Sequence, residues 1–207
     1  KDLECVSHVY DLDLAETLRK SLQEGIYTFN VHAAAARATA DKLDLNGGEL
    51  VVIAGFGRFG QSVLNELQEG ACSDTLFHVV DPVLDVEAAR DELGERKITN
   101  VEFTRKDMLA CDLWENELKS AADTASRTFI LICTDNDTGN LTFGLKLVNQ
   151  GRADQVYLRL FKPVQLLERG DLRDSGIVPV VVWKDMTAGL PDNFPSTLKR
   201  DLKKTSS

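Results

Sequence analysis

A glycine-rich run that directly follows a short apolar stretch is the feature that most constrains the fold. Five apolar residues, 50–54, precede Gly55-Phe56-Gly57-Arg58-Phe59-Gly60, and residues 58–68 carry apolar side chains at helical spacing. The G-x-G-x-x-G spacing is typical of a buried strand that turns sharply into a helix. A lone motif of this kind is weak evidence, but its flanking stretches have the periodicity that the turn requires. The run therefore predicts the start of a βαβ unit.

The remaining sequence continues this alternation of strands and helices. We expect strands at residues 50–54, 76–80, 101–103, 129–133, 155–160 and 178–182, and helices at 58–68, 85–93, 113–122, 138–149 and 163–169. Strands that alternate with helices at this spacing form parallel sheets. The predicted fold class is α/β, a Rossmann-type doubly wound parallel sheet in strand order 3-2-1-4-5-6.

The chain divides into three predicted parts. Residues 1–48 form a helical extension with helices at 14–24 and 30–45, where Asn30 is positioned to cap the second helix. This alanine-rich helix is either a connector that packs in an oligomer or a helix lying on its own domain. Residues 49–185 form the Rossmann-like domain, and 186–207 a helical or frayed tail. The chain begins at Lys1 instead of Met, so we expect it to be part of a longer protein.

Composition limits the classes of partner. Lys plus Arg is 24 and Asp plus Glu is 33, a formal net charge of −9. Such a surface repels phosphate backbones, so we expect no nucleic-acid partner. No apolar run approaches the roughly 20 residues of a transmembrane helix. The four cysteines lack metal-ligand spacing, so we expect reduced thiols and no metal. His78 lies within an apolar run and is expected to be structural.

The glycine run predicts a phosphate site. Gly55 permits the tight turn, Gly57 lets a pyrophosphate approach the backbone, and Gly60 lets the helix pack against the sheet. The first amides of the helix lack intrahelical partners and attract anions. Arg58 opposes the helix macrodipole unless an anion binds there; the alternative is an arginine that faces solvent. The alternative for the whole run is a glycine turn that only packs.

Two further groups of polar residues follow predicted strands. Asp81 ends the second strand, 21 residues after Gly60, where a carboxylate accepts hydrogen bonds from ribose hydroxyls and disfavours the 2′-phosphate of NADP. Alternatively, Asp81 only begins the turn at Pro82. Residues 134–137, Thr-Asp-Asn-Asp, follow the fourth strand at the switch point of the sheet. They are suited to bind ribose, to bind a cation, or to cap the next helix through Asp137.

The sequence lacks familiar catalytic motifs. It contains no Tyr-x-x-x-Lys pair of the short-chain reductase kind, no G-x-S-x-G, no H-E-x-x-H and no Walker lysine. We therefore expect a domain that senses a nucleotide and is not an enzyme. The alternatives are the NAD-binding domain of an oxidoreductase whose catalytic part is absent from this chain, and a scaffold that has lost its ligand.

Several of these motifs together resemble a known family. Residues 51–60, V-V-I-A-G-F-G-R-F-G, with Asp81, the step 106–108 (Lys-Asp-Met), and T-D-N-D followed by Asn140, resemble the RCK or KTN domain, also called TrkA-N. That domain regulates potassium channels and potassium uptake systems. The resemblance covers about residues 49–182. The family commonly has Gly-Asp-Ala where this chain has the bulkier Lys106 and Met108 around Asp107.

The resemblance implies a set of binding residues and partners. It places the phosphates on Gly55, Gly57, Arg58 and Gly60, the ribose on Asp81, the adenosine near Asp107, and the far side of the site at Thr134, Asp135 and Asn140. Phe59, Met108 and Arg159 complete the set of expected binding residues. The implied ligand is NAD or NADH, or alternatively ATP, ADP or AMP. The implied assembly is a homodimer or larger homo-oligomer, attached to the membrane portion of a potassium channel or transporter on the cytoplasmic side of the cell membrane.

Overall fold

The computed structural model describes residues 5–8, 26–95, 100–108, 110, 113–161, 175–190, 194, 196 and 200. The predicted helices at 14–24 and 163–169, and most of the predicted tail, lie outside the described residues. Among the residues described, no helix has both the length and the apolar character to cross a membrane.

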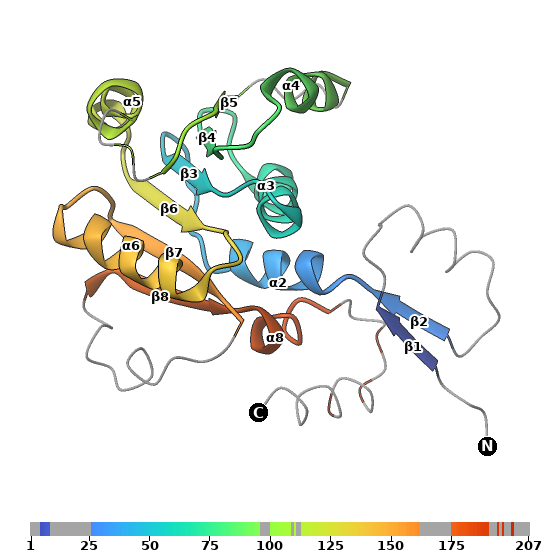
Figure 1. Ribbon diagram of the computed structural model, residues 1–207. Coiled ribbons are helices and arrows are strands. Elements are labelled where there is room, and N and C mark those ends of the chain that lie inside the picture. The colour runs from blue at the N-terminus through green and yellow to red at the C-terminus, as the bar shows by residue number, and fades with distance from the viewer. Residues whose placement is uncertain are drawn as a thin grey trace.

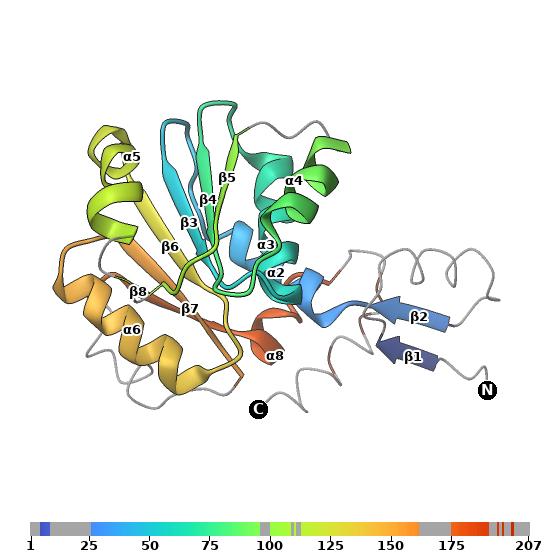
Figure 2. The same ribbon diagram turned by 45° about the horizontal axis from the view of Figure 1, so that its top comes forward.

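A six-stranded parallel sheet forms the centre of the domain (Figures 1 and 2). Its strands are β3 (Leu50–Ala54), β4 (Leu76–Val80), β5 (Val101–Thr104), β6 (Thr128–Ile132), β7 (Gln155–Leu160) and β8 (Ile177–Val181). They lie in the order β5-β4-β3-β6-β7-β8, and each neighbouring pair is parallel. In chain order this is 3-2-1-4-5-6, which confirms the predicted topology.

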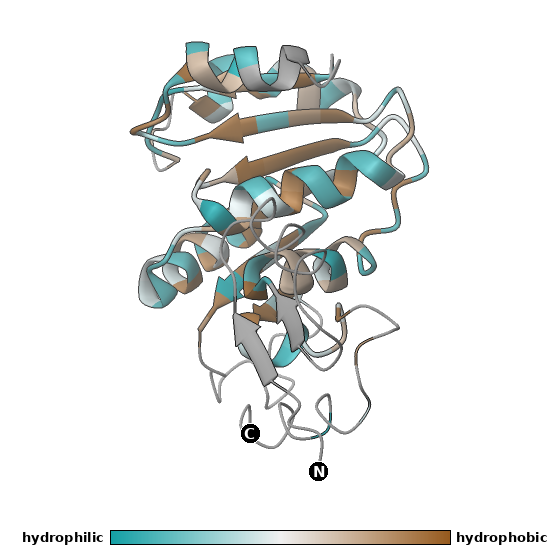
Figure 3. Cartoon of the chain, turned by 90° about the vertical axis from the view of Figure 1, so that its right-hand side faces the viewer, coloured by the Kyte–Doolittle hydropathy of each residue, from teal (hydrophilic) through white to brown (hydrophobic). Residues whose placement is uncertain are grey.

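Helices cover both faces of the sheet. Helices α2 (Val31–Ala40) and α3 (Arg58–Gly70) lie on one side, and α5 (Lys119–Thr124) and α6 (Asp137–Asn149) on the other (Figures 1 and 2). The elements also include α4 (Val86–Glu95) and the short α8 (Val182–Asp185). Because β3 is buried on both faces, all five of its side chains are apolar: Val51 and Ile53 lie in one core, and Leu50 and Val52 in the other. Figure 3 shows the apolar residues concentrated on the strands.

The predicted helix at 113–122 is two elements in the structure. Residues Leu113–Glu117 form a π-helical turn, η1, and α5 begins at Lys119. The amide of Leu118 donates to the carbonyl of Leu113 at 2.9 Å, a five-residue bond that is one residue wider than an α-helical bond. The wider turn buries both leucines completely in the same core. Packing against the sheet therefore overrides the regular helical spacing.

Helix α2 lies on its own domain. Its cap is Asn30, as predicted, whose side chain accepts hydrogen bonds from the amides of His32 and Ala33. The helix packs on α3 and α8, and a Cβ built on Gly189 would lie 1.8 Å from the Ala34 carbonyl oxygen. This close packing explains the alanine-rich sequence and shows that the helix lies on its own domain. The helix ends at Ala40, five residues before the predicted end.

Ion pairs fix α2 at both of its flanks. The Arg37 guanidinium donates two hydrogen bonds to the Glu66 carboxylate on α3, at 3.1 and 3.2 Å. Beyond the helix end, the Lys42 ammonium lies 2.9 Å from the Asp185 carboxylate at the end of α8. The side chain of Tyr157, on β7, donates to the Lys42 carbonyl at 3.1 Å. The segment before β3 is therefore attached to α3, to α8 and to the sheet.

A second, two-stranded sheet lies outside the main one. Strands β1 (Cys5–His8) and β2 (Ile26–Phe29) pair in parallel, from Cys5 opposite Ile26 to His8 opposite Phe29 (Figure 1). Only helices were predicted before residue 49, so these two strands were missed. Each is four residues long, and their pairing joins segments more than 20 residues apart, which a local sequence pattern does not encode.

Candidate functional site

The glycine loop connects β3 to α3 at the carboxyl edge of the sheet. Gly55 has φ +99°, a left-handed conformation that side chains rarely adopt, and its amide donates to the Val80 carbonyl at 2.8 Å. A Cβ on Gly55 would lie 3.1 Å from the Thr134 amide nitrogen. The turn is therefore tight, lies against two neighbouring strands, and requires glycine at this position.

The other two glycines differ in the space around them. A Cβ on Gly60 would lie 2.1 Å from the Gly55 carbonyl oxygen and 3.5 Å from the Cβ of Cys133. A Cβ on Gly57 would meet no heavy atom of the described residues within 4 Å. Gly60 thus permits close packing of α3, while the approach to Gly57 is open. Because Gly57 is the N-cap and has no side chain, the first amides of α3 have no side-chain cap.

Asp81 braces the glycine loop from the neighbouring strand. One carboxylate oxygen accepts a hydrogen bond from the Phe56 amide at 2.8 Å, and the other accepts from the Val83 amide at 2.9 Å. The residue therefore begins the turn after β4, as the alternative interpretation held, and also holds the loop. Each carboxylate oxygen has a further lone pair, so the side chain retains acceptor capacity for a ligand hydroxyl.

A cavity of about 350 Å³ lies beside Asp81, between the glycine loop and α4. Phe56, Gln61 and Leu84 line it together with Gly57 and Asp81. Neither Phe56 nor Gln61 was predicted as a site residue. Phe56 occupies a variable position of the glycine motif, so the motif gave no signal for it. Gln61 follows the motif directly, and its side-chain amide donates to the Phe56 carbonyl at 3.2 Å.

Asn140 and Arg159 hold the loop that follows β6. The Asn140 amide group donates to the carbonyls of Thr134, at 2.9 Å, and Arg159, at 2.8 Å, and its oxygen accepts from the Thr134 hydroxyl. Asn140 is only 1% exposed. It was expected to line the ligand site; the structure places it at the wall of a cavity beside Thr134, with both amide donors used by the backbone. Asn140 is therefore a positioning residue, because it fixes Thr134.

The buried Arg159 guanidinium performs a similar role. It donates to the Thr134 carbonyl at 2.8 Å and lies over the Phe161 ring, 4.4 Å from its centroid, and over the Phe59 ring, at 5.6 Å. Burial lowers the pKa of Arg159, and the nearby carboxylates of Asp135 and Asp137 oppose this shift. Phe59 is 3% exposed and belongs to the core. Both residues were predicted to bind cofactor; in the structure Phe59 packs in the core and Arg159 holds the Thr134 carbonyl.

The cap of α6 differs from the predicted one. The Asn136 side chain accepts from the Gly139 amide at 2.9 Å and is the N-cap. The Asp137 carboxylate, for which capping of this helix was one of the predicted alternatives, accepts instead from the amide of Phe161 at 3.0 Å, and so ties α6 to the end of β7. Asp135 is exposed in the same loop. Within the described residues, no group of three or more His, Cys, Asp or Glu is arranged to hold a metal ion.

A second cavity, of about 410 Å³, brings together residues from two predicted segments. Asp107 and Met108, after β5, face Thr134 and the first turns of α6 across it. The cavity also contains Lys146, which was not predicted. Gly139, Thr142, Phe143 and Lys146 all line it, and their spacing along α6 is that of one helix face, a pattern present in the sequence.

His78, predicted to be structural, is buried in the sheet at 4% exposure. Its Nε2 lies 2.9 Å from the Thr104 hydroxyl, and burial lowers its pKa. The prediction is confirmed, and His78 takes no part in the crevice.

Comparison with solved structures identifies the architecture. This chain shares its fold with a part of the GsuK channel. The likeness to the "GsuK Channel" structure has a TM-score of 0.60 at 17% sequence identity, and it covers 98% of this chain and 45% of that one. A structure of GsuK bound to ADP gives a TM-score of 0.58 at 16% identity, over 97% of this chain and 45% of the other. This chain thus spans less than half the length of those chains. No protein-family model and no curated protein matches the sequence.

Proposed function

We propose that this chain is the nucleotide-sensing regulatory domain of a potassium channel or potassium transport system, on the cytoplasmic side of the membrane. The observation that carries the proposal is the glycine loop, which is braced by Asp81 and open above Gly57. The fold shared with a channel, and a structure of that channel bound to ADP, support it. The RCK-like motifs in the sequence support it independently.

The ligand that we propose is an adenine nucleotide or NAD(H), lying over the carboxyl ends of the strands. Its phosphates would contact the first amides of α3, where a helix N-terminus favours negative charge, with exposed Arg58 alongside. Asp81 would accept from the ribose hydroxyls. Asp107, Met108 and Thr134 would surround the adenine in the second cavity. Asn140, Arg159 and Phe59 would affect nucleotide binding indirectly, because they fix the loops that contact the ligand.

The proposal includes a route from the ligand to the rest of the chain. A ligand changes a conformational equilibrium only as far as it binds two arrangements with different affinity. Helix α3 begins at the glycine loop, and its Glu66 holds Arg37 of α2. A shift of α3 on binding would therefore move the segment that precedes the domain. In a homo-oligomer, this would alter the packing between copies.

We propose no catalysis at the site. The thiol of Cys133 lies beneath the glycine loop, and burial raises its pKa to about 12, so that it is protonated at neutral pH and is a poor nucleophile. The domain would bind and release its nucleotide unchanged. The competing proposal, an oxidoreductase's NAD-binding domain, predicts instead that NAD(H) binds while ADP and AMP bind far more weakly.

Titration calorimetry of the 207-residue chain with ADP, AMP, ATP, NAD and NADH tests the proposal. We expect saturable binding of at least one adenine nucleotide, and weaker binding of NADP than of NAD, because Asp81 repels a 2′-phosphate. Absence of binding by all of them at millimolar concentration would contradict it. Chromatography of the nucleotide after incubation checks that it is recovered intact.

A further inference from the structure

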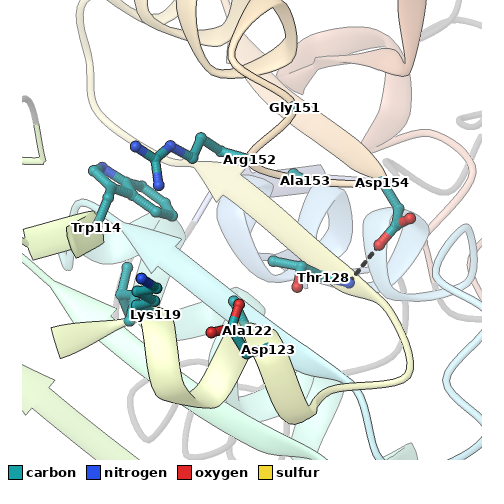
Figure 4. A pocket seen from close by; sticks show the side chains of 10 residues that line it. Trp114, Lys119, Ala122, Asp123, Thr128, Gly151, Arg152, Ala153 and Asp154 are labelled. Atoms are coloured by element: carbon teal, nitrogen blue, oxygen red, sulfur yellow. Dashed lines mark hydrogen bonds between the residues drawn. The ribbon is translucent and has the colours of Figure 1, made fainter. Parts of the chain in front are cut away.

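A third cavity lies at the opposite edge of the sheet from the glycine loop. It has a volume of about 310 Å³ and is bounded by Trp114 and α5, by the first residue of β6, and by the loop that leads into β7 (Figure 4). Thr128 begins β6, whereas the loop that meets Gly55 follows the end of the same strand. At about 3.3 Å per residue, the two sites are separated by the length of β6, about 16 Å. This cavity is therefore distinct from the proposed nucleotide site.

Two cations lie at one end of the cavity. Figure 4 shows the Arg152 guanidinium beside the indole of Trp114, with Lys119 on the neighbouring helix. Neither the Arg152 nor the Lys119 side chain forms a hydrogen bond or ion pair within the described part of the chain. In a chain of net charge −9, two cations that have no ion pair with any described residue make their end of the cavity attractive to an anion.

The cavity also has an apolar wall. Trp114 is 8% exposed and Leu118 is completely buried, and both belong to the core on this face of the sheet. The Trp114 indole is fixed in place because its Nε1 donates to the Met108 carbonyl at 3.2 Å. The edge of this ring and the methyl group of Ala122 therefore offer a rigid surface for the apolar body of a ligand.

The other end of the cavity is acidic. The Asp154 carboxylate is turned toward β6 and accepts from the Thr128 amide at 2.7 Å (Figure 4). Asp123 is exposed on α5 at the same cavity. These carboxylates disfavour a second negative charge on the ligand at this end. The charge pattern of the cavity thus selects a molecule with one acidic group.

From this pattern we infer a second small-molecule site that binds an organic monoacid. The carboxylate of the ligand would be held by Arg152 and Lys119, since a guanidinium offers a planar pair of donors to a carboxylate. Its apolar body would lie against Trp114 and Ala122. The cavity volume of about 310 Å³ is at the small end of the range for small-molecule sites and accommodates a small organic acid.

The test uses Trp114 as the reporter. The chain contains two tryptophans, Trp114 and Trp183, so Trp183→Phe leaves a single indole, at the cavity wall. This protein is titrated with cyclohexanecarboxylate, cyclohexylammonium, cyclohexane-1,4-dicarboxylate and inorganic phosphate at constant ionic strength, and fluorescence is recorded. We expect a saturable change with cyclohexanecarboxylate, weaker binding of the dicarboxylate and of phosphate, and no saturable change with cyclohexylammonium.

Variants test whether the fluorescence change comes from an anion bound at Arg152 and Lys119. Arg152→Ala combined with Lys119→Ala should weaken cyclohexanecarboxylate binding by at least about tenfold, the loss expected for a charged hydrogen bond. Arg90→Ala, the same change at an exposed position on α4, should leave the affinity unchanged. Asp123→Asn should leave monoacid binding intact and strengthen dicarboxylate binding. Circular dichroism verifies that each variant folds.

Three outcomes would overturn the inference: no saturable change with any anion, equal affinity for the cyclohexylammonium cation, or unchanged affinity in the double variant. Competition with ADP tests whether this cavity is independent of the proposed nucleotide site. Added ADP should not displace cyclohexanecarboxylate, so failure of one site leaves the other testable.

Discussion

The Asp81 carboxylate accepts a hydrogen bond from the Phe56 amide at 2.8 Å, and so links the end of β4 to the glycine loop that ends β3. The loop is therefore held in shape by a neighbouring strand before any ligand binds. A loop that is already in its binding conformation loses less entropy on binding. The same carboxylate is positioned at the side of the cavity where the ribose is proposed to lie.

Replacement of Asp81 should affect folding and ligand choice together. Asp81→Ala leaves two backbone amides without their partner and should lower the free energy of unfolding by about 1–3 kcal/mol, measured by urea denaturation. It should also remove the discrimination between ADP and 2′,3′-dideoxy-ADP in calorimetry, because the hydroxyls lose their acceptor. Asp91→Ala, on the exposed side of α4, is the control. Persistence of the wild-type discrimination in Asp81→Ala would contradict the assigned role.

Alanine substitutions at Gly60 and Gly57 should affect different properties, the first the stability of the fold and the second the binding of ADP. Gly60→Ala places a Cβ 2.1 Å from the Gly55 carbonyl and should destabilise the fold by about 1–3 kcal/mol through overpacking. Gly57→Ala meets open space and should lower the free energy of unfolding by less than about 1 kcal/mol. Gly57→Ala should nevertheless weaken ADP binding, because the methyl group occupies the approach to the amides. Equal affinity of Gly57→Ala and wild type would place the phosphates elsewhere.

Two asparagines near the start of α6 should differ in how strongly the same change to aspartate lowers stability. Asn140→Asp replaces a buried amide that donates to two carbonyls by a group that can only accept when ionised, and should cost about 2–4 kcal/mol. Asn136→Asp retains a good N-cap and should change stability by less than about 0.5 kcal/mol. Thermal denaturation of both variants measures the difference. A tolerant Asn140→Asp would show that the amide is not required as a donor.

Glu49 should make folding sensitive to acid. Burial tends to raise the pKa of this 1%-exposed carboxyl, but hydrogen bonds from Asn46, Arg127 and Gly47 outweigh burial and lower the pKa below its usual 4.5. Since the folded pKa is lower than the unfolded one, the stabilisation is present above about pH 4.5 and is lost as pH falls through the folded value. Urea denaturation as a function of pH should show this loss.

Glu49→Gln should make the free energy of unfolding depend less on pH in the acidic range. It should also lower that free energy at neutral pH, because the charge that holds Arg127 is removed. Glu115→Gln, at an exposed position of η1, should leave the pH profile unchanged. A profile that Glu49→Gln does not alter would assign the acid sensitivity to other carboxyl groups.

Local sequence signals predicted the sheet well. The limits of β3, β4 and β7 match the apolar runs at 50–54, 76–80 and 155–160, and β6 and β8 begin one residue earlier than expected. Strands buried on both faces require continuous apolar residues, which makes them easy to find in a sequence. The residue at which a strand begins or ends also depends on its pairing with the neighbouring strand, as for Thr128, which lies opposite Leu50. A single run of residues does not contain that information.

Structural roles near the candidate site were predicted correctly where they depend on a residue's own backbone conformation or close packing. Gly55 and Gly60 are set by backbone angle and contact, which the motif encodes. The roles of Asn140 and Asp137 depend on contacts with Arg159 and Phe161, 19 and 24 residues away. Their types suggested a polar loop, but only the packing of α6 against β7 decides which backbone groups these side chains hold.

A crystal structure of this chain with ADP tests the central claim most directly. We predict the phosphates within hydrogen-bond distance of the first amides of α3 above Gly57, and the ribose hydroxyls on the Asp81 carboxylate. An empty crevice at saturating ADP, or ADP bound with the glycine loop and Asp81 untouched, would contradict the account.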